Sequence, residues 1–340
     1  MPESRFFHTY TCRTTIIRFS AALFLVAYLL CSPAIGHAQK TIVVIPKATI
    51  LNFWKILCVG AHDAIKGQDI NLIWRGPRVE NKSKAQQHLL KFYTDKKVEA
   101  IVIAPADKEK LNQDIEEAVQ AGIKVVIIDS PVTTTAPQTY IATDNYKAGE
   151  LGAQMLAGKI KSTGPILLIG HTPENGASFL REKGFIDRIN ELLPGQSVIR
   201  LHMENGSERE TRIAAGEILN ALPSIAGIFA VNEPTSDGVL HVLSKHPDIS
   251  IPFIAFDNNK NLVQGIKDGK VSGLIAQKPY ALGFFGVNAA IDLIDGKKVG
   301  RTMESPVTVI TQDNVNISST LKCLQKMTER EKAVCPICFN

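Results

Sequence analysis

The sequence lacks the short motifs by which common enzyme classes are recognised. It contains no GxSxG nucleophile elbow and no HExxH pair, and the phosphate-binding patterns GxxxxGK[ST] and GxGxxG do not occur. The eight histidines are scattered, and His171, which follows an apolar run, has no evident nucleophile beside it in sequence. The residues therefore favour binding over catalysis, and a secreted hydrolase is the weakest of the alternatives.

Excess charge of one sign is lacking too. Lys and Arg number 38 against 33 Asp and Glu, which gives a formal charge of +5. A nucleic-acid-binding domain normally shows a strongly basic face or stripe, so no nucleic-acid partner is expected. Aromatic residues make up only 6%, whereas 45% of the 340 residues are hydrophobic, enough for a large core shared between two lobes.

The N-terminus has the pattern of a secretory signal peptide. Arg5, Arg13 and Arg18 precede an apolar run over residues 21–30, and small residues follow up to Ala38. The apolar run is shorter than the roughly 20 residues that span a bilayer. We expect residues 1–38 to be a signal peptide cleaved after Ala38 and the protein to be exported to the periplasm; an uncleaved anchor is the alternative.

Cysteine is sparse, with six residues, two of them in the expected signal peptide. Of these two, Cys31 is a weak lipid-anchor candidate, because the residue before it is too large for that motif. Cys58 falls on an expected helix and is interpreted as a small buried hydrophobe. In an oxidising compartment, Cys323 is expected to pair with Cys335 or Cys338, with free thiols or half of a zinc site as alternatives. No cofactor and no metal are predicted.

Short β-branched runs alternate with longer amphipathic segments from residue 40 onward. Ten such runs lie between residues 41 and 276, and helical patterns such as residues 108–121 separate them. Nearly continuous apolar strands joined by helices indicate parallel sheets covered on both faces. The predicted fold is α/β, with two doubly wound, Rossmann-like lobes. Residues 321–340 lose the pattern and are interpreted as a cysteine-containing tail.

Polar residues follow many of these runs. In doubly wound sheets, ligands bind at the carboxyl ends of the strands. Carboxylates and amides at these ends suit a hydroxyl-rich ligand. The Phe53-Trp54 pair suits the apolar face of a sugar ring. The alternative for this pair is packing in the hydrophobic core. The polar strand-end candidates are Asp129, Ser130, Asn232, Asp257 and Gln277.

Several segments, in order, resemble those of type I periplasmic solute-binding proteins of the ribose/galactose-binding class. The resemblance extends over residues 40–311. The segments that carry it are Asn52-Phe53-Trp54, Val125-Val126-Ile127-Ile128-Asp129-Ser130, Ala142-Thr143-Asp144-Asn145, Ser178-Phe179-Leu180-Arg181-Glu182-Lys183-Gly184-Phe185, Phe229-Ala230-Val231-Asn232, Ile254-Ala255-Phe256-Asp257 and Leu274-Ile275-Ala276-Gln277.

The resemblance implies a three-strand hinge between the lobes, near Asp144, Gln277 and Ser305. The N-terminal lobe would comprise residues 40–144 plus 278–305, and the C-terminal lobe residues 145–277 plus 306–320. It also implies a monomer that captures a sugar or polyol-like molecule between the lobes and delivers it to an ABC permease. A membrane sensor, such as a chemoreceptor or histidine kinase, is the alternative partner. The fold is also that of the ligand domains of lac-type repressors, but here the expected signal peptide occupies the place of a DNA-binding head, so a repressor is not expected.

The resemblance assigns a role to each candidate residue. Phe53 and Trp54 would be ring platforms, while Asp129 (with Ser130 beside it), Asn232, Asp257 and Gln277 would hold the polar groups. Arg181 would either contact the ligand or support the lobe. Phe179 stands where the pentose-binding pattern has an arginine, so we expect Phe179 to offer an apolar face and ribose not to be the best ligand.

Overall fold

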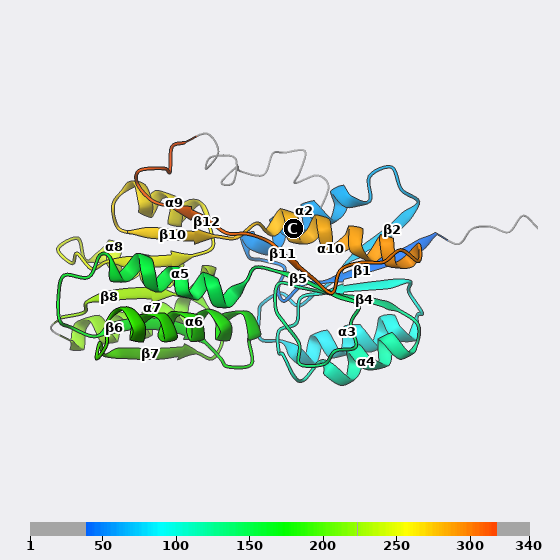
Figure 1. Cartoon of the computed structure of the whole chain (residues 1–340), viewed down its shortest axis with the longest axis horizontal. Helices are drawn as coiled ribbons and strands as arrows, with labels where there is room; N and C mark the ends of the chain where they lie inside the picture. The colour runs from blue at the N-terminus through cyan, green and yellow to red at the C-terminus, as the bar shows by residue number, and fades with distance from the viewer. Residues whose placement is uncertain (1–38, 223, 318–340) are drawn as a thin grey trace, which may run out of the picture. The chain divides into compact units, whose positions relative to one another are not determined.

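The computed structural model describes residues 39–222 and 224–317, and Figure 1 shows the order of their elements. Within these ranges, twelve strands form two six-stranded sheets, here called the first and the second sheet. The first sheet and its helices comprise β1 (Lys40–Ile45), α2 (Asn52–Ala64), β2 (Ile70–Trp74), α3 (Ser83–Asp95), β3 (Ala100–Ile103), α4 (Asn112–Gln120), β4 (Lys124–Ile128), β5 (Thr139–Ala142), α10 (Pro279–Ile294) and β11 (Thr302–Glu304). The second sheet and its helices comprise α5 (Asn145–Ala157), β6 (Ile166–His171), α6 (Gly176–Leu192), β7 (Val198–Met203), α7 (Glu208–Ala221), β8 (Gly227–Ala230), α8 (Glu233–Lys245), β9 (Phe253–Phe256), α9 (Lys260–Lys267), β10 (Gly273–Ala276) and β12 (Thr308–Ile310).

The two sheets repeat one topology. The strand order of the first is β2-β1-β3-β4-β5-β11 and that of the second is β7-β6-β8-β9-β10-β12. Every pairing is parallel except that of β12 with β10. In both sheets the strand order reverses beside the first strand, and such a reversal opens a crevice at the carboxyl ends.

Successive side chains along each strand point to opposite faces of the sheet, so a hydrophobic core forms on each face. In β1, Ile42 and Val44 pack in the cluster with α2 and α10, whereas Val43 and Ile45 pack in the cluster with α3 and α4. The second sheet is covered in the same way by α5 and α6 on one face and by α7, α8 and α9 on the other. Each of these buried side chains contributes about 1.5–3 kcal/mol of burial free energy. Because both faces of the sheets are buried, the strands are unbroken apolar runs in the sequence.

The chain passes between the sheets three times. It leaves the first sheet after β5, returns to it between β10 and α10, and leaves it again between β11 and β12. These passages lie at residues 143–144, 277–278 and 305–307, at the places where the hinge was expected. The prediction of an α/β fold with two parallel doubly wound sheets is confirmed.

Two local features differ from the sequence prediction. Strands β11 and β12 were not among the ten expected, because each has only three residues and β11 is exposed. Helix α4 begins at Asn112, four residues later than expected. The reason is that Asp107 Oδ1 accepts hydrogen bonds from the backbone N–H groups of Glu109 and Lys110 (3.0 and 2.9 Å), which fixes a turn ahead of the helix.

The interpretation of Cys58 needs correction. It is fully buried on α2, as expected, but it is disulfide-bonded and does not act as a free hydrophobe. No sequence pattern indicated this bond, since the side chain lies on an apolar helix face. The expected signal peptide and the tail with Cys323, Cys335 and Cys338 lie outside the described residues.

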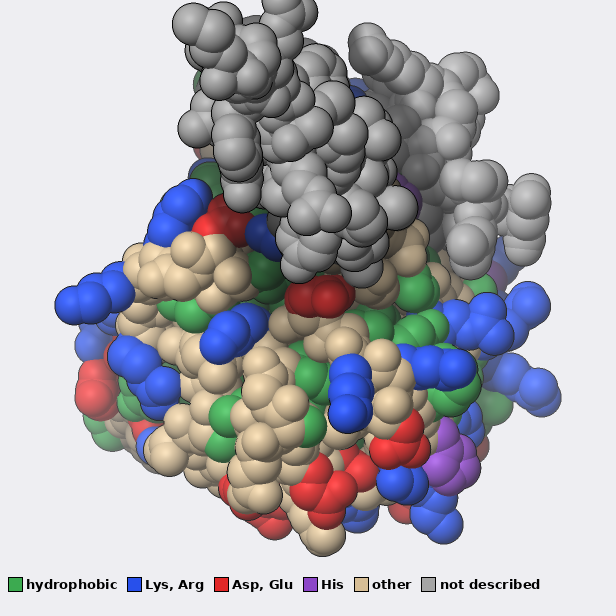
Figure 2. Space-filling view, turned by 90° about the vertical axis from the view of Figure 1, so that its right-hand side faces the viewer, with side chains coloured by type: hydrophobic (Ala, Val, Ile, Leu, Met, Phe, Trp, Pro, Cys, Tyr) green, Lys and Arg blue, Asp and Glu red, His purple; other side chains and the backbone are tan. Residues whose placement is uncertain are grey.

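The surface in Figure 2 carries charges of both signs. Lys and Arg side chains are dispersed over this face, with Asp and Glu between them, and form no continuous stripe in the visible part. Within the described ranges, the helices are too short or too polar to cross a membrane.

Candidate ligand-binding site

Strand ends of both sheets surround one cavity, with about 350 Å³ of empty space that includes space open to solvent. Its lining includes an aromatic pair, six ionisable side chains and several amides. The lining residues are Lys47, Leu51, Phe53, Trp54, Glu80, Asp129, Asn175, Ala177, Ser178, Arg181, Asn232, Glu233, Pro234, Asp257 and Gln277.

Asp129 and Asp257 occupy equivalent positions, directly after the fourth strand in the order of each sheet. Both have left-handed backbones, with φ of 64° and 65°, and both donate their backbone N–H to the next strand, to Ile141 O (3.0 Å) and Ile275 O (2.9 Å). Such a conformation costs of order 1–3 kcal/mol in a residue other than glycine. This strain lies at two cavity-lining residues and is held by the adjoining strand.

Lys47 binds Asp129 at the first sheet. Its ammonium lies 2.8 Å from Asp129 Oδ2 and donates to the Ser130 hydroxyl. It also lies 3.4 Å from Oδ1 of Asn175, the residue that caps α6 on the second sheet. Lys47 is only 3% exposed, so one carboxylate of the cavity is neutralised by a buried cation.

Arg181 is buried on α6 and is held by uncharged acceptors. It donates to Asn145 Oδ1, Val231 O and Gln277 Oε1, each at 2.8 Å. Its guanidinium carbon lies 3.8 Å from the centroid of the Phe256 ring. The side chain therefore lines the cavity and also fixes the start of α5 and the end of β10.

Asn232 and Glu233 form the corner between β8 and α8. The Asn232 side chain accepts from Thr235 N (3.1 Å) in a capping box, while Glu233 N donates to Asp257 Oδ2 (2.9 Å). Glu233 Oε2 accepts from Phe53 N (3.2 Å) at the start of α2. This hydrogen bond joins the second sheet's layer to the first.

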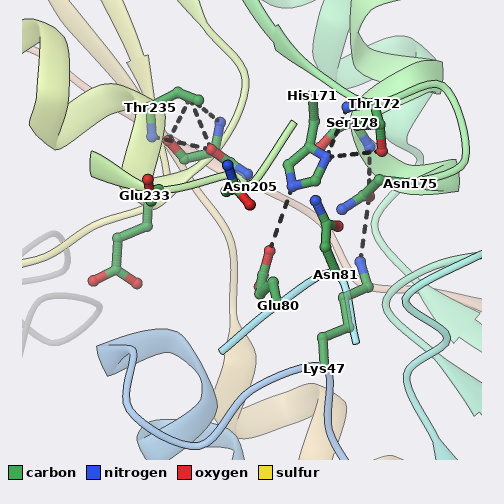
Figure 3. A network of polar contacts seen from close by, with 12 residues as sticks. Lys47, Glu80, Asn81, His171, Thr172, Asn175, Ser178, Asn205, Glu233 and Thr235 are labelled. Atoms are coloured by element: carbon green, nitrogen blue, oxygen red, sulfur yellow. Dashed lines mark hydrogen bonds and ion pairs between the residues drawn. The ribbon is translucent and has the colours of Figure 1, made fainter. Parts of the chain in front are cut away.

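The side chains of Glu80 and His171 point toward each other from different segments of the chain, as Figure 3 shows. Glu80 accepts from Trp54 Nε1 (3.0 Å), and His171 Nε2 lies 4.0 Å from Glu80 Oε2. His171 Nδ1 accepts from Thr172 N (2.8 Å), so the hydrogen-bond network assigns the ring proton to Nε2. The ring also fills the space beside Gly206, where a Cβ would lie 2.2 Å from Nε2.

Burial dominates the electrostatics of these groups. Desolvation raises the pKa of Glu233 to about 8 and that of Asp257 to about 7, with the neighbouring carboxylate adding to the rise for Glu233. The pKa of Glu80 is raised for the same reason. Desolvation, with help from the Lys47 charge, lowers the pKa of His171 to about 3. His171 is therefore neutral at physiological pH.

A model of the family described as "Periplasmic binding protein domain" matches residues 42–298. The chain belongs to this family. The match includes every described strand except β11 and β12, and every residue of the cavity lining.

Relatives of this periplasmic binding protein are sugar-binding transport proteins. The ribose import binding protein RbsB of Bacillus subtilis is 29% identical over 234 residues, which cover 68% of this chain and 75% of that protein. Among solved structures, a carbohydrate transporter solute binding protein from Agrobacterium radiobacter in complex with D-arabinose is similar at a TM-score of 0.81 and 26% identity, covering 85% of this chain and all of that one. An ABC transporter solute binding protein from Agrobacterium vitis with bound D-fucose has a TM-score of 0.79 and 28% identity, covering 84% and 100%. The family resemblance is thereby confirmed, as is the expectation of a binding protein that is not an enzyme.

Most of the residues predicted for this periplasmic binding protein's site meet at the cavity. Seven of the nine line it: Phe53, Trp54, Asp129, Arg181, Asn232, Asp257 and Gln277. Ser130 lies behind Asp129 and contacts Lys47. The Phe179 ring is not part of the lining; the Lys108 ammonium lies 4.3 Å from its centroid.

Three charged lining residues had no assigned role in the sequence analysis. Lys47 and Glu233 each follow a strand end closely, so their positions offered a signal. Glu80 lies six residues after β2, in a loop without regular structure, and nothing in the sequence pointed to it. Only the tertiary structure, which brings loops from different strands together, places all three side chains at one cavity.

Proposed function

We propose that this protein captures a sugar or sugar-like molecule in the cavity between its two sheets and delivers it to an ABC importer. The proposal is supported by the family and by relatives that bind ribose, D-arabinose and D-fucose. A hydroxyl-rich ligand would donate to the carboxylates and accept from the amides of Asn232 and Gln277. The Phe53 and Trp54 rings, edge to face at a centroid distance of 4.9 Å, would pack against its apolar face.

The observation that carries the proposal is that both sheets supply residues to the lining of the cavity. Asp129 and Asp257 enter the cavity from equivalent strand ends of two sheets, and amides and aromatics lie between them. A ligand held by both would be enclosed on two sides. Polar groups closed in this way reject molecules that leave them unpaired, which gives specificity.

Binding would be coupled to a hinge motion. The moving units would be residues 40–144 plus 278–305 and residues 145–277 plus 306–320, joined by the three passages near Asp144, Gln277 and Ser305. The two units make direct contacts, among them Phe53 N to Glu233 Oε2 and Lys108 N to Glu174 O (3.0 Å). These contacts would form on closure around the ligand.

The setting of this function would be the periplasm. The signal pattern of residues 1–38, with cleavage after Ala38, would direct export. The mature protein would act as a monomer whose partners are the ligand and an ABC permease, with no nucleic acid involved.

The experiment is to identify the ligand and then remove one contact. Mass spectrometry of small molecules that copurify with the protein, followed by thermal-shift screening of sugars and polyols, should find a ligand that raises the Tm. Calorimetry should then show that Asp257→Asn weakens binding about tenfold or more, because a buried hydrogen-bond partner is changed.

Asp107→Asn is the matched control. Asp107 is also a buried strand-end aspartate, but it caps a turn and does not line the cavity. Its substitution should leave the affinity unchanged. Equal affinities for wild type and Asp257→Asn, or the absence of binding by any sugar or polyol, would contradict the proposal.

A further inference from the structure

The cavity holds more negative than positive side chains. Four carboxylates line it and only two cations do. Lys47 pairs with Asp129 at 2.8 Å, which accounts for one charge of each sign. Glu80, Glu233 and Asp257 remain, and each is buried or nearly so.

The second cation does not pair with them directly. All three hydrogen bonds that Arg181 makes in the described part of the chain go to uncharged oxygens. Its guanidinium is stacked on Phe256. Arg181 therefore offsets part of the negative potential of the cavity without forming an ion pair with these carboxylates.

The three remaining carboxylates receive only neutral donors within residues 39–222 and 224–317. Glu80 accepts from the Trp54 indole, Glu233 from Phe53 N and Asn259 Nδ2 (3.3 Å), and Asp257 Oδ2 from Glu233 N. Asp257 Oδ1 is buried and has no hydrogen-bond partner there. Asp257 is 6% exposed and lines the cavity, so this unpartnered oxygen marks a place for a donor of the ligand.

We propose that the ligand carries a protonated amine, as an amino sugar or amino polyol does, and that Asp257 and Glu233 hold its ammonium while Glu80 adds negative potential. This inference rests on the proposed function and narrows its ligand class. A buried carboxylate is costly unless a cation pairs with it. An ammonium group supplies three donors and a charge, whereas a hydroxyl supplies one donor and no charge.

A metal ion fits the site less well. In the described ranges, no three His, Cys, Asp or Glu side chains are grouped closely enough to hold one. An ammonium on a larger polar ligand needs no such closely packed set. It can contact Asp257 and Glu233 while the remaining hydroxyls reach the amides.

A neutral ligand would leave a different proton balance, because Asp257 and Glu233 could then keep the protons that they hold in the ligand-free protein near pH 7. Burial raises the pKa of both Asp257 and Glu233 when no cation is present. The charged groups that act on the two are Arg181, Asp129, Glu80 and Asp237, together with each other. A bound ammonium favours the ionised carboxylates, so an amine that is already protonated should bind with release of protons from these carboxyls.

The test is titration calorimetry of the full-length mature protein at pH 7 with matched sugar pairs. The probes are D-glucosamine with D-glucose, D-galactosamine with D-galactose, and D-mannosamine with D-mannose, with the N-acetyl sugars as uncharged controls of similar size. We expect the amine of at least one pair to bind about tenfold or more tighter than its hydroxyl counterpart and its N-acetyl form. Repeating the titrations in buffers of different ionisation enthalpy should show proton release on binding of the amine and not on binding of its hydroxyl counterpart.

Isosteric variants test which carboxylates cause the preference for an amine over a hydroxyl sugar. Asp257→Asn and Glu233→Gln should each reduce the amine preference at least severalfold, while Asp107→Asn should retain it. If the hydroxyl sugar binds as tightly as its amine in every pair, the amine inference is overturned and the sugar-binding function stands. If no sugar of this series binds, the amine inference is overturned, and the thermal-shift screen of the other sugars and of polyols decides the sugar-binding function. The wild-type comparison decides the matter by itself should a variant fail to fold.

Discussion

At the scale of single residues, Asp129 and Asp257 share a backbone conformation and differ in electrostatic surroundings. Both have positive φ after equivalent strands. Asp129 has the Lys47 ammonium at 2.8 Å, whereas one oxygen of Asp257 has no partner among the residues described. The first aspartate therefore stabilises the ligand-free protein, and the second is available to a ligand.

The same substitution at these two sites should lower the free energy of unfolding at one site and not at the other. Asp129→Asn leaves the buried Lys47 ammonium without a counter-charge and should lower the ligand-free free energy of unfolding by about 1–3 kcal/mol. Asp257→Asn removes an unpaired buried charge and should not lower it. Asparagine tolerates the left-handed backbone at both sites. Urea unfolding of the ligand-free proteins measures this, and equal destabilisation would contradict the assignment.

The pH dependence of stability should reflect Asp257 and Glu233. Burial raises the pKa of Asp257 from 3.8 to about 7 and that of Glu233 from 4.5 to about 8. Each carboxyl therefore holds a proton in the folded protein at a pH where the unfolded chain has lost it. Their stabilising contribution is complete below the unfolded values and is lost as pH rises to about 8.

Urea unfolding of the ligand-free protein at pH 5 and pH 8 measures this loss. The double variant Glu233→Gln/Asp257→Asn should lose less stability between these values than the wild type. Some pH dependence of the stability will remain in the double variant, because burial also raises the pKa of Asp237, to about 6. An unchanged difference between pH 5 and pH 8 would show that neither carboxyl is the cause.

At the scale of elements, close helix packing positions Arg181. Helices α5 and α6 approach at two glycines: a Cβ on Gly149 would lie 2.0 Å from Arg181 O, and one on Gly184 would lie 2.1 Å from Tyr146 O. These contacts are with backbone atoms, which cannot move aside as a flexible side chain can. The glycines therefore fix the distance between α5 and the backbone of Arg181.

Gly149→Ala should separate the two helices and misplace Arg181. We expect it to lower stability by about 1–3 kcal/mol, as overpacking does, and to weaken ligand binding as well. Gly216→Ala on α7 is the control, since nothing lies within 4 Å of its Cβ position. It should raise stability by about 0.5–1 kcal/mol through helix propensity and leave binding unchanged. Denaturation and calorimetry on both variants check this, and a neutral Gly149→Ala would contradict the packing argument.

At the scale of the whole molecule, few contacts join the two sheet layers apart from the connecting strands. Several involve backbone groups, such as Phe53 N to Glu233 Oε2 and Lys108 N to Glu174 O. Phe179 on α6 is next to Lys108 of the first sheet's layer, with the ammonium 4.3 Å from the ring centroid. These contacts, together with a ligand in the cavity, would hold the two layers closed.

Small-angle X-ray scattering should therefore detect closure. The radius of gyration of the ligand-free protein should be larger than that of the ligand-bound protein. Phe179→Ala should shift the ligand-free protein further toward the open form, because a cation–π contact worth roughly 0.5–1 kcal/mol is lost. Phe92→Ala is the control: Phe92 also contacts a lysine, Lys96, but within its own layer. A radius of gyration that does not change with ligand would rule out the hinge.

The fold and the strand-end part of the site were predictable from the sequence for one physical reason. Apolar β-branched runs joined by amphipathic helices form parallel sheets, and all carboxyl ends of a parallel sheet lie on one edge. Asp129, Asn232, Asp257 and Gln277 follow such runs directly, so their approach to a common crevice was a consequence of strand direction. The chemistry of a sugar ring pointed to the aromatic pair on α2, and the family resemblance then gave the pair the same role.

Only the tertiary structure decided which groups pair across the cavity. The Lys47 to Asp129 ion pair, the Glu80 to Trp54 hydrogen bond and the Glu233 to Phe53 contact each join segments from different loops. No local pattern fixes where such loops meet, because their positions depend on helix packing and on the three passages between the sheets. The sequence therefore determined the kind of fold and the sheet edge at which the candidate site lies, and the packing of the loops determined which charged groups line that cavity.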